Sequence, residues 1–279
     1  MKQRIFSTLA LLIILTSALF FGGPIAGIWI ITLCGVLTQY ELYLILEKAG
    51  YHPMKRLGLI LGMVIILGTF YLPQFSNDFL DNPSAELFTA SALLICSVAI
   101  FGKKEITYKS SSFISTLFGI IYIPYMLMHL VLLMMNTSDL QQGFFLSLWV
   151  VVTAKLSDTG GFLVGRFYGK KKLASEISPQ KTWEGVIGAV FLSALGAYLF
   201  ALIGHNNLPE SFIPWKAAVI AIPIAFIAIF SDLVESLFKR HAGLKDSGKI
   251  VPGIGGAFDL LDSVILSAPT GYLILKYVL

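Results

Sequence analysis

The sequence predicts an all-α, polytopic integral membrane protein with about nine transmembrane helices. Of its 279 residues, 56% are hydrophobic and 13% are charged, whereas an average soluble protein has about 25% charged residues. The mean hydropathy is +0.81, and the apolar residues form long runs instead of recurring at every second or fourth position. This composition excludes an ordinary soluble globular protein.

Nine apolar segments account for most of the chain. They cover approximately residues 5–21, 25–46, 57–72, 87–101, 113–135, 144–156, 185–204, 217–238 and 260–279. A membrane-spanning helix needs about 20 apolar residues, and several of these segments are shorter or polar at one end. The sixth is the least regular because it contains Lys155 and runs into Ser157 and Asp158. The first follows a basic start, as a signal peptide does, but no polar sequence succeeds it, so we expect a membrane anchor.

The charged residues of the loops alternate between the two sides of the predicted membrane. Cytoplasmic loops usually carry the excess of Lys and Arg, and 17 of the 20 basic residues fall at the N-terminus or in every second loop. These residues are Lys2, Arg4, Lys48, Lys55, Arg56, Lys103, Lys104, Lys109, Arg166, Lys170, Lys171, Lys172, Lys181, Lys239, Arg240, Lys245 and Lys249. The opposite side receives only Lys216 and Lys276. The pattern predicts nine crossings, with the N-terminus in the cytoplasm and the C-terminus outside.

The two parts of the chain differ in charge, although we expect them to form one structural unit. Residues 1–148 hold N-terminal transmembrane helices that are mostly uncharged, with Glu41 as the one acidic exception within their segments. Residues 149–279 combine transmembrane helices with cytoplasmic basic loops, and carboxylates enter or flank almost every segment. The two cysteines and four histidines show no metal-binding spacing. We therefore expect the catalytic region to be the C-terminal one.

Two pairs of carboxylates stand at membrane-segment ends in this region. Asp232 and Glu235 are three residues apart, which places both on one face of a helix, and Asp259 and Asp262 repeat the spacing. Neighbouring carboxylates in or near lipid need a partner cation, and oxygen ligands without His or Cys select Mg²⁺ or a similar hard cation. The alternatives are a helix end that meets water, a basic loop as partner, or an acidic first turn that the helix dipole favours.

A basic and glycine-rich loop lies between the two acidic pairs. Its basic residues can neutralise phosphate oxygens, and its glycines allow backbone N–H groups to turn toward an anion. The chemically relevant residues of this loop are Lys239, Arg240, Lys245, Asp246, Gly255 and Gly256. The alternative is a positive-inside loop with a flexible turn.

A second basic region follows the sixth segment. Gly161, Gly165 and Gly169 are spaced by four, so one face of a helix there is bare and can pack closely on a neighbour. Polar residues, among them Asp158 before the glycines and Ser178 and Lys181 after them, are dense enough to suggest a site at the level of the lipid headgroups. A basic run near anionic lipid can also be only an anchor.

The motifs of the C-terminal region occur in a fixed order that resembles one enzyme family. They are Asp158-Thr159-Gly160-Gly161, Ile177-Ser178-Pro179-x-Lys181-Thr182-Trp183-Glu184-Gly185, Ser231-Asp232-x-x-Glu235-Ser236, Lys239-Arg240, Lys245-Asp246, Pro252-Gly253-x-Gly255-Gly256 and Asp259-x-x-Asp262. Together they resemble the phosphatidate cytidylyltransferases, also called CDP-diacylglycerol synthases. The resemblance implies an all-helical membrane enzyme that joins CTP and phosphatidic acid into CDP-diacylglycerol, releases pyrophosphate and requires Mg²⁺.

The resemblance also implies roles for individual residues. As metal ligands it implies Asp232 and Asp259, supported by Glu235 and Asp262. As catalytic residues we expect Asp232, Asp259, Lys239 and Asp246. As substrate-binding residues we expect Arg240, Lys245, Lys181, Ser178, Asp158, Gly255 and Gly256. The family pattern commonly has His at the position of Ile254 and Arg at that of Leu260, so any role of those side chains is absent here or supplied by another residue.

Two other functions are compatible with the sequence. A CTP-dependent lipid or polyprenol kinase could use similar carboxylates and basic residues. A cation-coupled transporter could use intramembrane carboxylates, but it predicts inverted repeats and broken helices near the midplane, and neither is evident. The expected partners are CTP, phosphatidic acid and membrane lipids, with no nucleic acid, and the sequence leaves a homodimer open. The expected location is the bacterial inner membrane, with the active site facing the cytoplasm.

Overall fold

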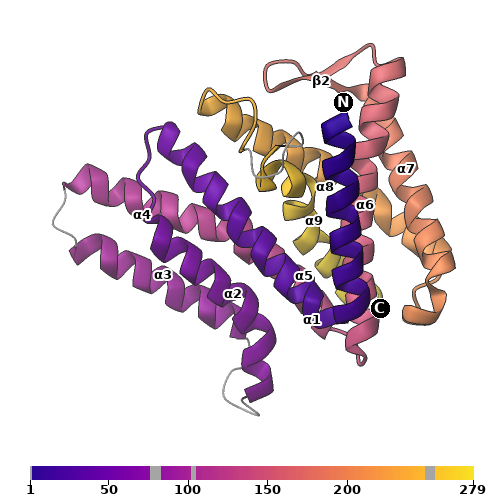
Figure 1. Cartoon of the computed structure of the whole chain (residues 1–279), viewed down its shortest axis with the longest axis horizontal. Helices are drawn as coiled ribbons and strands as arrows, with labels where there is room; N and C mark the ends of the chain where they lie inside the picture. Colours follow the sequence, from indigo (N-terminus) through magenta and orange to yellow (C-terminus); the bar gives the residue numbers. More distant parts are fainter. Residues whose placement is uncertain (1, 76–82, 102–104, 249–254) are drawn as a thin grey trace. The chain divides into compact units, whose positions relative to one another are not determined.

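The computed structural model describes residues 2–75, 83–101, 105–248 and 255–279, and these residues are almost entirely helical (Figure 1). The elements in chain order are α1 (Lys2–Lys48), α2 (Lys55–Phe75), α3 (Pro83–Phe101), α4 (Ile106–Ile120), the π-helix η1 (Ile121–Tyr125), α5 (Met126–Met135), α6 (Leu140–Tyr168), β1 (Lys172–Ala174), β2 (Ser178–Thr182), α7 (Trp183–Ile203), the 3₁₀-helix η2 (His205–Asn207), α8 (Pro214–His241) and α9 (Ala257–Val278). The prediction of an all-α fold is confirmed, with one short hairpin added to it.

Each of the nine apolar segments falls within these helices. The first two share α1, which turns at Gly23, where φ is 55° and ψ is −144°. A glycine adopts this positive φ without a Cβ clash, and Pro24 has no N–H that the preceding stretch would have to satisfy. The sequence gives no sign that both segments belong to one interrupted helix, because glycine and proline also mark ordinary loops.

Six helical stretches in the described residues are long and apolar enough to cross a membrane. They are Ile13–Lys48, Lys55–Gln74, Ile106–Met135, Trp183–Ile203, Pro214–His241 and Ala257–Val278. The described apolar part of α3, Glu86–Phe101, is shorter. Helix α6 is long enough but does not meet the same criterion, and it carries Lys155 and Asp158. The structure therefore supports a polytopic membrane protein, while the count of nine crossings stays a prediction.

The chain folds into two compact units. Unit 1 consists of Met1–Val131 and Phe238–Leu261, and unit 2 consists of Leu132–Leu237 and Asp262–Leu279. Helices α8 and α9 each contribute residues to both units. The loop after α8 and the first turn of α9 thus belong to the unit of the N-terminal helices, although they are distant in sequence.

The core of unit 1 is organised around a buried tyrosine. The hydroxyl of Tyr43 on α1 donates to the carbonyl oxygen of Thr116 on α4 at 3.0 Å. Gln39 Nε2 donates to that hydroxyl and to the carbonyl oxygen of Gly58 on α2, each at 3.0 Å. A side chain at Gly58 or Gly119 would clash with the Tyr43 ring. The Tyr43 hydroxyl and the Gln39 amide nitrogen thus find hydrogen-bond partners inside the helix bundle, where lipid offers none.

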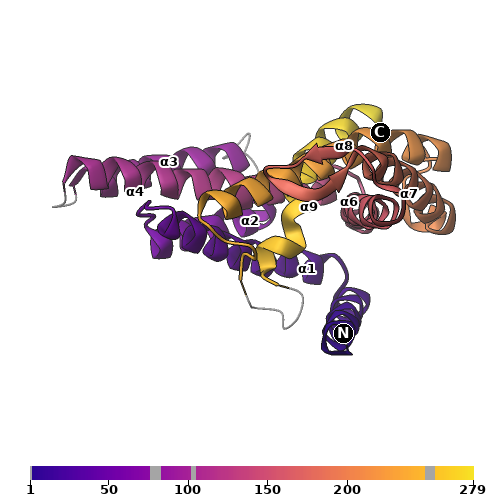
Figure 2. The ribbon, with the colours of Figure 1, turned by 90° about the horizontal axis from the view of Figure 1, so that it is seen from above.

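Close contact between α6 and α7 defines unit 2 (Figures 1 and 2). A Cβ added at Gly160 would clash with the carbonyl oxygen of Gly188, and one at Gly161 would lie 3.7 Å from the carbonyl oxygen of Gly185. One at Gly165 would lie 3.7 Å from Gly185 Cα. The predicted close packing of the glycine face is confirmed.

A short antiparallel hairpin connects α6 to α7. Its strands pair Lys172 with Thr182 and Ala174 with Ser178. Thr182 is the N-cap of α7, and its side chain accepts from the backbone N–H of Gly185 at 3.1 Å, which satisfies one of the helix's free N–H groups. The hairpin is therefore fixed at its C-terminal end, directly after Lys181.

Candidate functional site

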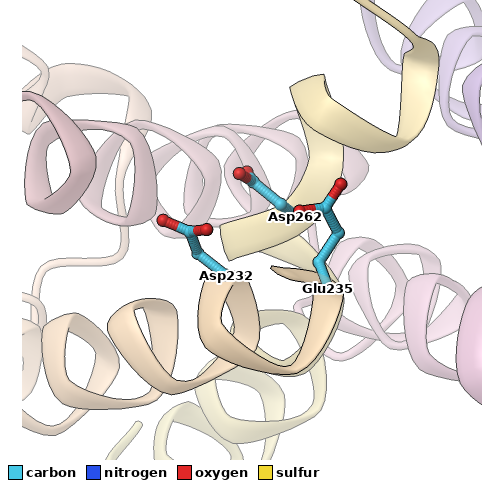
Figure 3. A group of neighbouring side chains, drawn as sticks. All are labelled: Asp232, Glu235 and Asp262. Carbon is cyan, nitrogen blue, oxygen red and sulfur yellow. The ribbon is translucent and has the colours of Figure 1, made fainter. Parts of the chain in front are cut away.

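Three carboxylates come together in unit 2. Asp232 and Glu235 extend from α8 toward Asp262 on α9 (Figure 3), and one oxygen of each lies within 4.8 Å of the others. Glu235 is fully buried, whereas Asp232 and Asp262 are partly exposed. The three-residue spacing on α8 places both of its carboxylates on one face, as the sequence predicts.

Two lysines form ion pairs with carboxylates of this cluster. Lys181 Nζ, from β2, lies 2.7 Å from Asp232 Oδ2 and donates to the carbonyl oxygen of Ile229 at 3.1 Å. Lys155 Nζ, from α6, lies 3.0 Å from Asp158 Oδ2 and 2.9 Å from Asp262 Oδ1. Three carboxylates are thus paired with two ammonium groups, which offsets part of the cost of placing acidic groups in a membrane bundle.

Serine side chains hold the carboxylates in place. Ser263 Oγ donates to Asp158 Oδ2 at 2.7 Å, and the backbone N–H of Ser263 donates to Asp262 Oδ1 at 2.7 Å. The Ser231 hydroxyl donates to the carbonyl oxygen of Asp262 and joins α8 to α9. These bonds restrict the rotamers of the acidic side chains, so the cluster has a defined geometry before any ligand binds.

A cavity of about 190 Å³ opens beside Asp232. Four residues predicted from the sequence line it: Asp158 from α6, Ser178 and Lys181 from the hairpin, and Asp232 from α8. Its other walls include the glycine contact between α6 and α7 and apolar side chains such as Phe162. The cavity combines a cationic group, two carboxylates and an apolar wall.

A second group of predicted residues lies in unit 1. Lys239 Nζ lies 2.8 Å from Asp259 Oδ1. Asp259 Oδ2 accepts from Ser247 N at 3.2 Å, Ser247 Oγ at 2.9 Å and Gly256 N at 2.8 Å. The bond from Gly256 N is the capping-box contact, in which an acidic side chain of the first turn reaches back to the residue before the helix. Asp259 therefore shapes the start of α9 whatever ligand it binds.

The remaining residues of the loop between α8 and α9 are more exposed. Arg240 donates to the carbonyl oxygen of Leu244 at 3.1 Å, and Lys245 and Asp246 are exposed. Gly255 has a φ of 138°, a conformation that favours glycine.

The structure thus divides the predicted residues between its units. In unit 2 it places Asp158, Ser178, Lys181, Asp232, Glu235 and Asp262. In unit 1 it places Lys239, Arg240, Lys245, Asp246, Gly255, Gly256 and Asp259. Leu260 lies partly buried on α9. Pro252, Gly253 and Ile254 lie outside the described residues.

Two charged residues in contact with predicted site residues were not predicted from the sequence. Lys155 forms ion pairs with both Asp158 and Asp262. The sequence feature that indicates such a role is a lysine inside an apolar segment, three residues before an aspartate. Glu41 Oε2 lies 2.9 Å from Ser247 Oγ, and in the sequence it is the one acidic residue within the apolar segments of residues 1–148. Intramembrane charges of this kind are functional candidates by default.

Comparisons with known proteins identify the family of the chain. The sequence model of the cytidylyltransferase family matches residues 2–278. The phosphatidate cytidylyltransferase of Staphylococcus saprophyticus is 29% identical over 271 residues, which cover 96% of each chain, and that of Staphylococcus aureus is 29% identical over 273 residues. The phosphatidate cytidylyltransferase of Haemophilus influenzae is 37% identical over 133 residues, which are 48% of this chain and 46% of that protein. Because the family match spans nearly its whole length, this chain belongs to the cytidylyltransferase family.

Proposed function

We propose that the protein condenses CTP with phosphatidic acid, giving CDP-diacylglycerol and pyrophosphate. The observation that carries the proposal is the cavity in unit 2, where Lys181 and Asp232 form an ion pair beside an apolar wall. Relatives that align over 96% of both chains bear the name phosphatidate cytidylyltransferase. A lipid phosphate and a membrane helix bundle suit each other because the acyl chains can remain in lipid while the headgroup reaches polar side chains.

The cavity has the size for a phosphate group but not for a whole nucleotide. Its volume of about 190 Å³ equals roughly six water molecules at ~30 Å³ each, and pockets that enclose drug-sized ligands measure about 300–1,000 Å³. We therefore assign to it a phosphate or headgroup portion of a substrate. Lys181 supplies the positive charge there, and Ser178 can donate a hydrogen bond.

The carboxylate cluster suits a magnesium ion. Its donors are all oxygens, the three groups lie within 4.8 Å of one another, and such hard ligands are the ones that Mg²⁺ prefers. With Asp158, Lys155 and Lys181 included, the ionised side chains leave two negative charges, which one divalent cation neutralises. Asp232, Glu235 and Asp262 would hold the ion. Asp259, in unit 1, stays a proposed metal ligand by the family resemblance alone. When bound, the ion supplies charge neutralisation on phosphate oxygens.

The protein's own task in this reaction is positioning and charge neutralisation. A phosphate monoester has a second pKa of about 6, so the attacking oxygen of phosphatidic acid is already anionic near neutral pH and needs no general base. That oxygen attacks the α-phosphorus of CTP, the bond to the β-phosphate oxygen breaks, and pyrophosphate leaves. Lys181 holds anionic oxygens at the cavity, while Lys239, Arg240 and Lys245 are assigned to other phosphate contacts. Orienting two reactants in this way can supply a large share of the rate enhancement.

We also propose nine crossings, an N-terminus in the cytoplasm, a C-terminus outside and a site that faces the cytoplasm of a bacterial inner membrane. All nine apolar segments lie in helices, and 17 of the 20 basic residues fall on one side of this topology. Helix α6 would be a crossing whose polarity reflects its site residues, Lys155 and Asp158, because both turn to other charged side chains.

The test uses purified protein and CTP that is labelled in either its α-phosphate or its γ-phosphate, and it measures which product carries the label. With phosphatidic acid and Mg²⁺, label in the α-phosphate should enter the lipid product, and label in the γ-phosphate should appear in pyrophosphate. Transfer of γ-label to lipid would instead identify a kinase, and transfer of neither label would contradict both enzyme assignments.

Matched variants connect this test to the site. Asp232→Asn should lower the rate by about 10²–10³-fold, the range for loss of one preorganised electrostatic group. Asp139→Asn is the control because Asp139 is the N-cap of α6, and asparagine caps helices as well as aspartate does. Equal rates for the two variants would contradict the role of Asp232.

A further inference from the structure

Glu41 is an acidic side chain buried in an apolar membrane helix. It lies on α1, within the stretch Ile13–Lys48, and is only 2% exposed. A carboxylate in such a place is costly and is retained in membrane helices mainly where it has a partner or a function. It lies in the N-terminal half of the chain, 206 positions before its partner Ser247.

The contacts of Glu41 are with the other segment of unit 1. Its Oε2 lies 2.9 Å from Ser247 Oγ and accepts from the backbone N–H of Phe258 at 2.9 Å. Phe258 is the second residue of α9, so its N–H has no partner within the helix and needs an outside acceptor. Glu41 thus caps α9 from a different helix.

The Ser247 hydroxyl joins Glu41 to Asp259. Ser247 Oγ lies 2.9 Å from Glu41 Oε2 and also 2.9 Å from Asp259 Oδ2. Asp259 is in turn paired with Lys239. A continuous set of contacts therefore runs from α1 through the serine to the aspartate.

Two glycines of the C-terminal loop make room for Glu41. A Cβ at Gly248 would clash with Glu41 Oε1, and a Cβ at Gly256 would clash with Glu41 Oε2 and with Ser247 Oγ. The backbone of Gly248 and that of Gly256 thus lie so close to the Glu41 carboxyl group that neither position has room for a side chain. This close approach means that a displacement of Glu41 must displace the loop and the start of α9.

We propose that Glu41 is a positioning residue of the cytidylyltransferase reaction. It holds Ser247 and the first turn of α9, and through them it sets the orientation of the Asp259 carboxylate. This inference rests on the proposed function, in which Asp259 is a metal ligand. Residues that orient a metal ligand typically change metal affinity or activity by about 10–100-fold when they are removed.

Metal binding and kinetics distinguish positioning from a purely structural role. In purified protein without substrates, Mn²⁺ binding followed by electron paramagnetic resonance should weaken by about 10–100-fold in Glu41→Ala. The Mg²⁺ concentration for half-maximal activity should rise by a similar factor, while the KM for phosphatidic acid stays unchanged. Glu41→Gln keeps an acceptor oxygen and should lose less than Glu41→Ala. A lower thermal stability with unchanged metal dependence would overturn the proposal.

Glu86→Ala is the matched control. It removes the same side chain from an exposed position on α3 in unit 1, and it should bind Mn²⁺ as the wild type does. If Glu41→Ala does not fold, Ser247→Ala tests the same relay and should show the same shift in Mg²⁺ dependence. Where both fold, the double variant should lose no more than the larger single loss, because both act through one hydroxyl. Additive losses would overturn the proposal.

Asp259→Asn separates this inference from the function on which it rests. Unchanged Mn²⁺ binding and unchanged synthesis in Asp259→Asn would overturn the role of Asp259 and with it the role of Glu41. Loss of both in Asp259→Asn, together with wild-type behaviour of Glu41→Ala and Ser247→Ala, would overturn the positioning role alone.

Discussion

Lys155 Nζ lies 2.9 Å from Asp262 Oδ1, and the two residues are 107 positions apart in the sequence. The same ammonium group lies 3.0 Å from Asp158 Oδ2, one turn along its own helix. The lysine therefore binds two carboxylates from two helices of unit 2. This one cation offsets part of the cost of burying each of the two carboxylates in the bundle.

Replacement of this lysine should destabilise the protein. Lys155→Met leaves two partly buried carboxylates without their cation, and the expected loss is about 1–3 kcal/mol, the cost of removing one partner of a buried polar contact. Thermal unfolding in detergent measures it. Lys276→Met, at an exposed lysine above the Tyr272 ring, should cost less than about 1 kcal/mol.

The reason for that loss can be tested with a second substitution. Adding Asp262→Asn to Lys155→Met removes one of the two stranded charges, so it should restore part of the stability, with a coupling energy of about 0.5–3 kcal/mol. Strictly additive losses would contradict the ion pair.

Lys181 should affect substrate binding more than stability. Lys181→Ala removes the cation that lines the cavity and pairs with Asp232, and we expect the KM for phosphatidic acid to rise by about tenfold or more, which corresponds to roughly 1.4 kcal/mol. Lys181→Arg should restore this only in part, because the planar guanidinium does not occupy the place of a compact ammonium. Lys216→Ala, at a partly exposed lysine outside the cavity lining, should leave the KM unchanged.

The contact between α6 and α7 should not tolerate a side chain at Gly160. Gly160→Ala places a methyl group against the backbone of Gly188, and overpacking of this kind costs about 1–3 kcal/mol. The neighbouring Gly161→Ala is the control, because its Cβ would meet only ordinary contacts at 3.6 and 3.7 Å, and alanine favours a helix over glycine by up to about 1 kcal/mol. Thermal unfolding should show opposite or clearly unequal shifts for the two neighbours.

The proposed topology predicts which loops react with a membrane-impermeant maleimide. In a chain with Cys34 and Cys96 replaced by alanine, Lys172→Cys in the hairpin should react only in inside-out vesicles. Asn207→Cys in η2 should react only in right-side-out vesicles. Labelling of both positions from the same side would contradict an α7 crossing between them.

Much of the fold could be predicted from the sequence because the membrane imposes it. Long apolar runs have few structural options in lipid other than helices, so each of the nine segments appears as helix. The Asp232 and Glu235 pair could also be predicted, since three-residue spacing on a helix is a local property. Contacts between distant helices have no such spacing. The contact of Lys155 with Asp262 is therefore indicated in the sequence only by a lone charge in an apolar segment. The same holds for the contact of Glu41 with Ser247.

The role of Asp259 shows a second limit of sequence patterns. Its spacing to Asp262 repeats that of Asp232 and Glu235, which suggested one set of four similar carboxylates. In the structure, Asp259 is a first-turn residue that accepts from Gly256 N and Ser247, whereas Asp262 belongs to the cluster with Asp232 and Glu235. A pattern of charges cannot separate these environments because helix capping and metal binding both favour an acidic residue at a helix start.

The glycine contact between α6 and α7 fixes one wall of the cavity in unit 2. Where two helices touch through side chains, a change of rotamer can widen or narrow the space beside them. Here Gly161 and Gly185, which line the cavity, leave backbone against backbone, so no torsion angle is available for such an adjustment. A relative with a different lipid preference would therefore have to vary the side chains that face the cavity, such as Phe162, and keep the separation of the two helices constant.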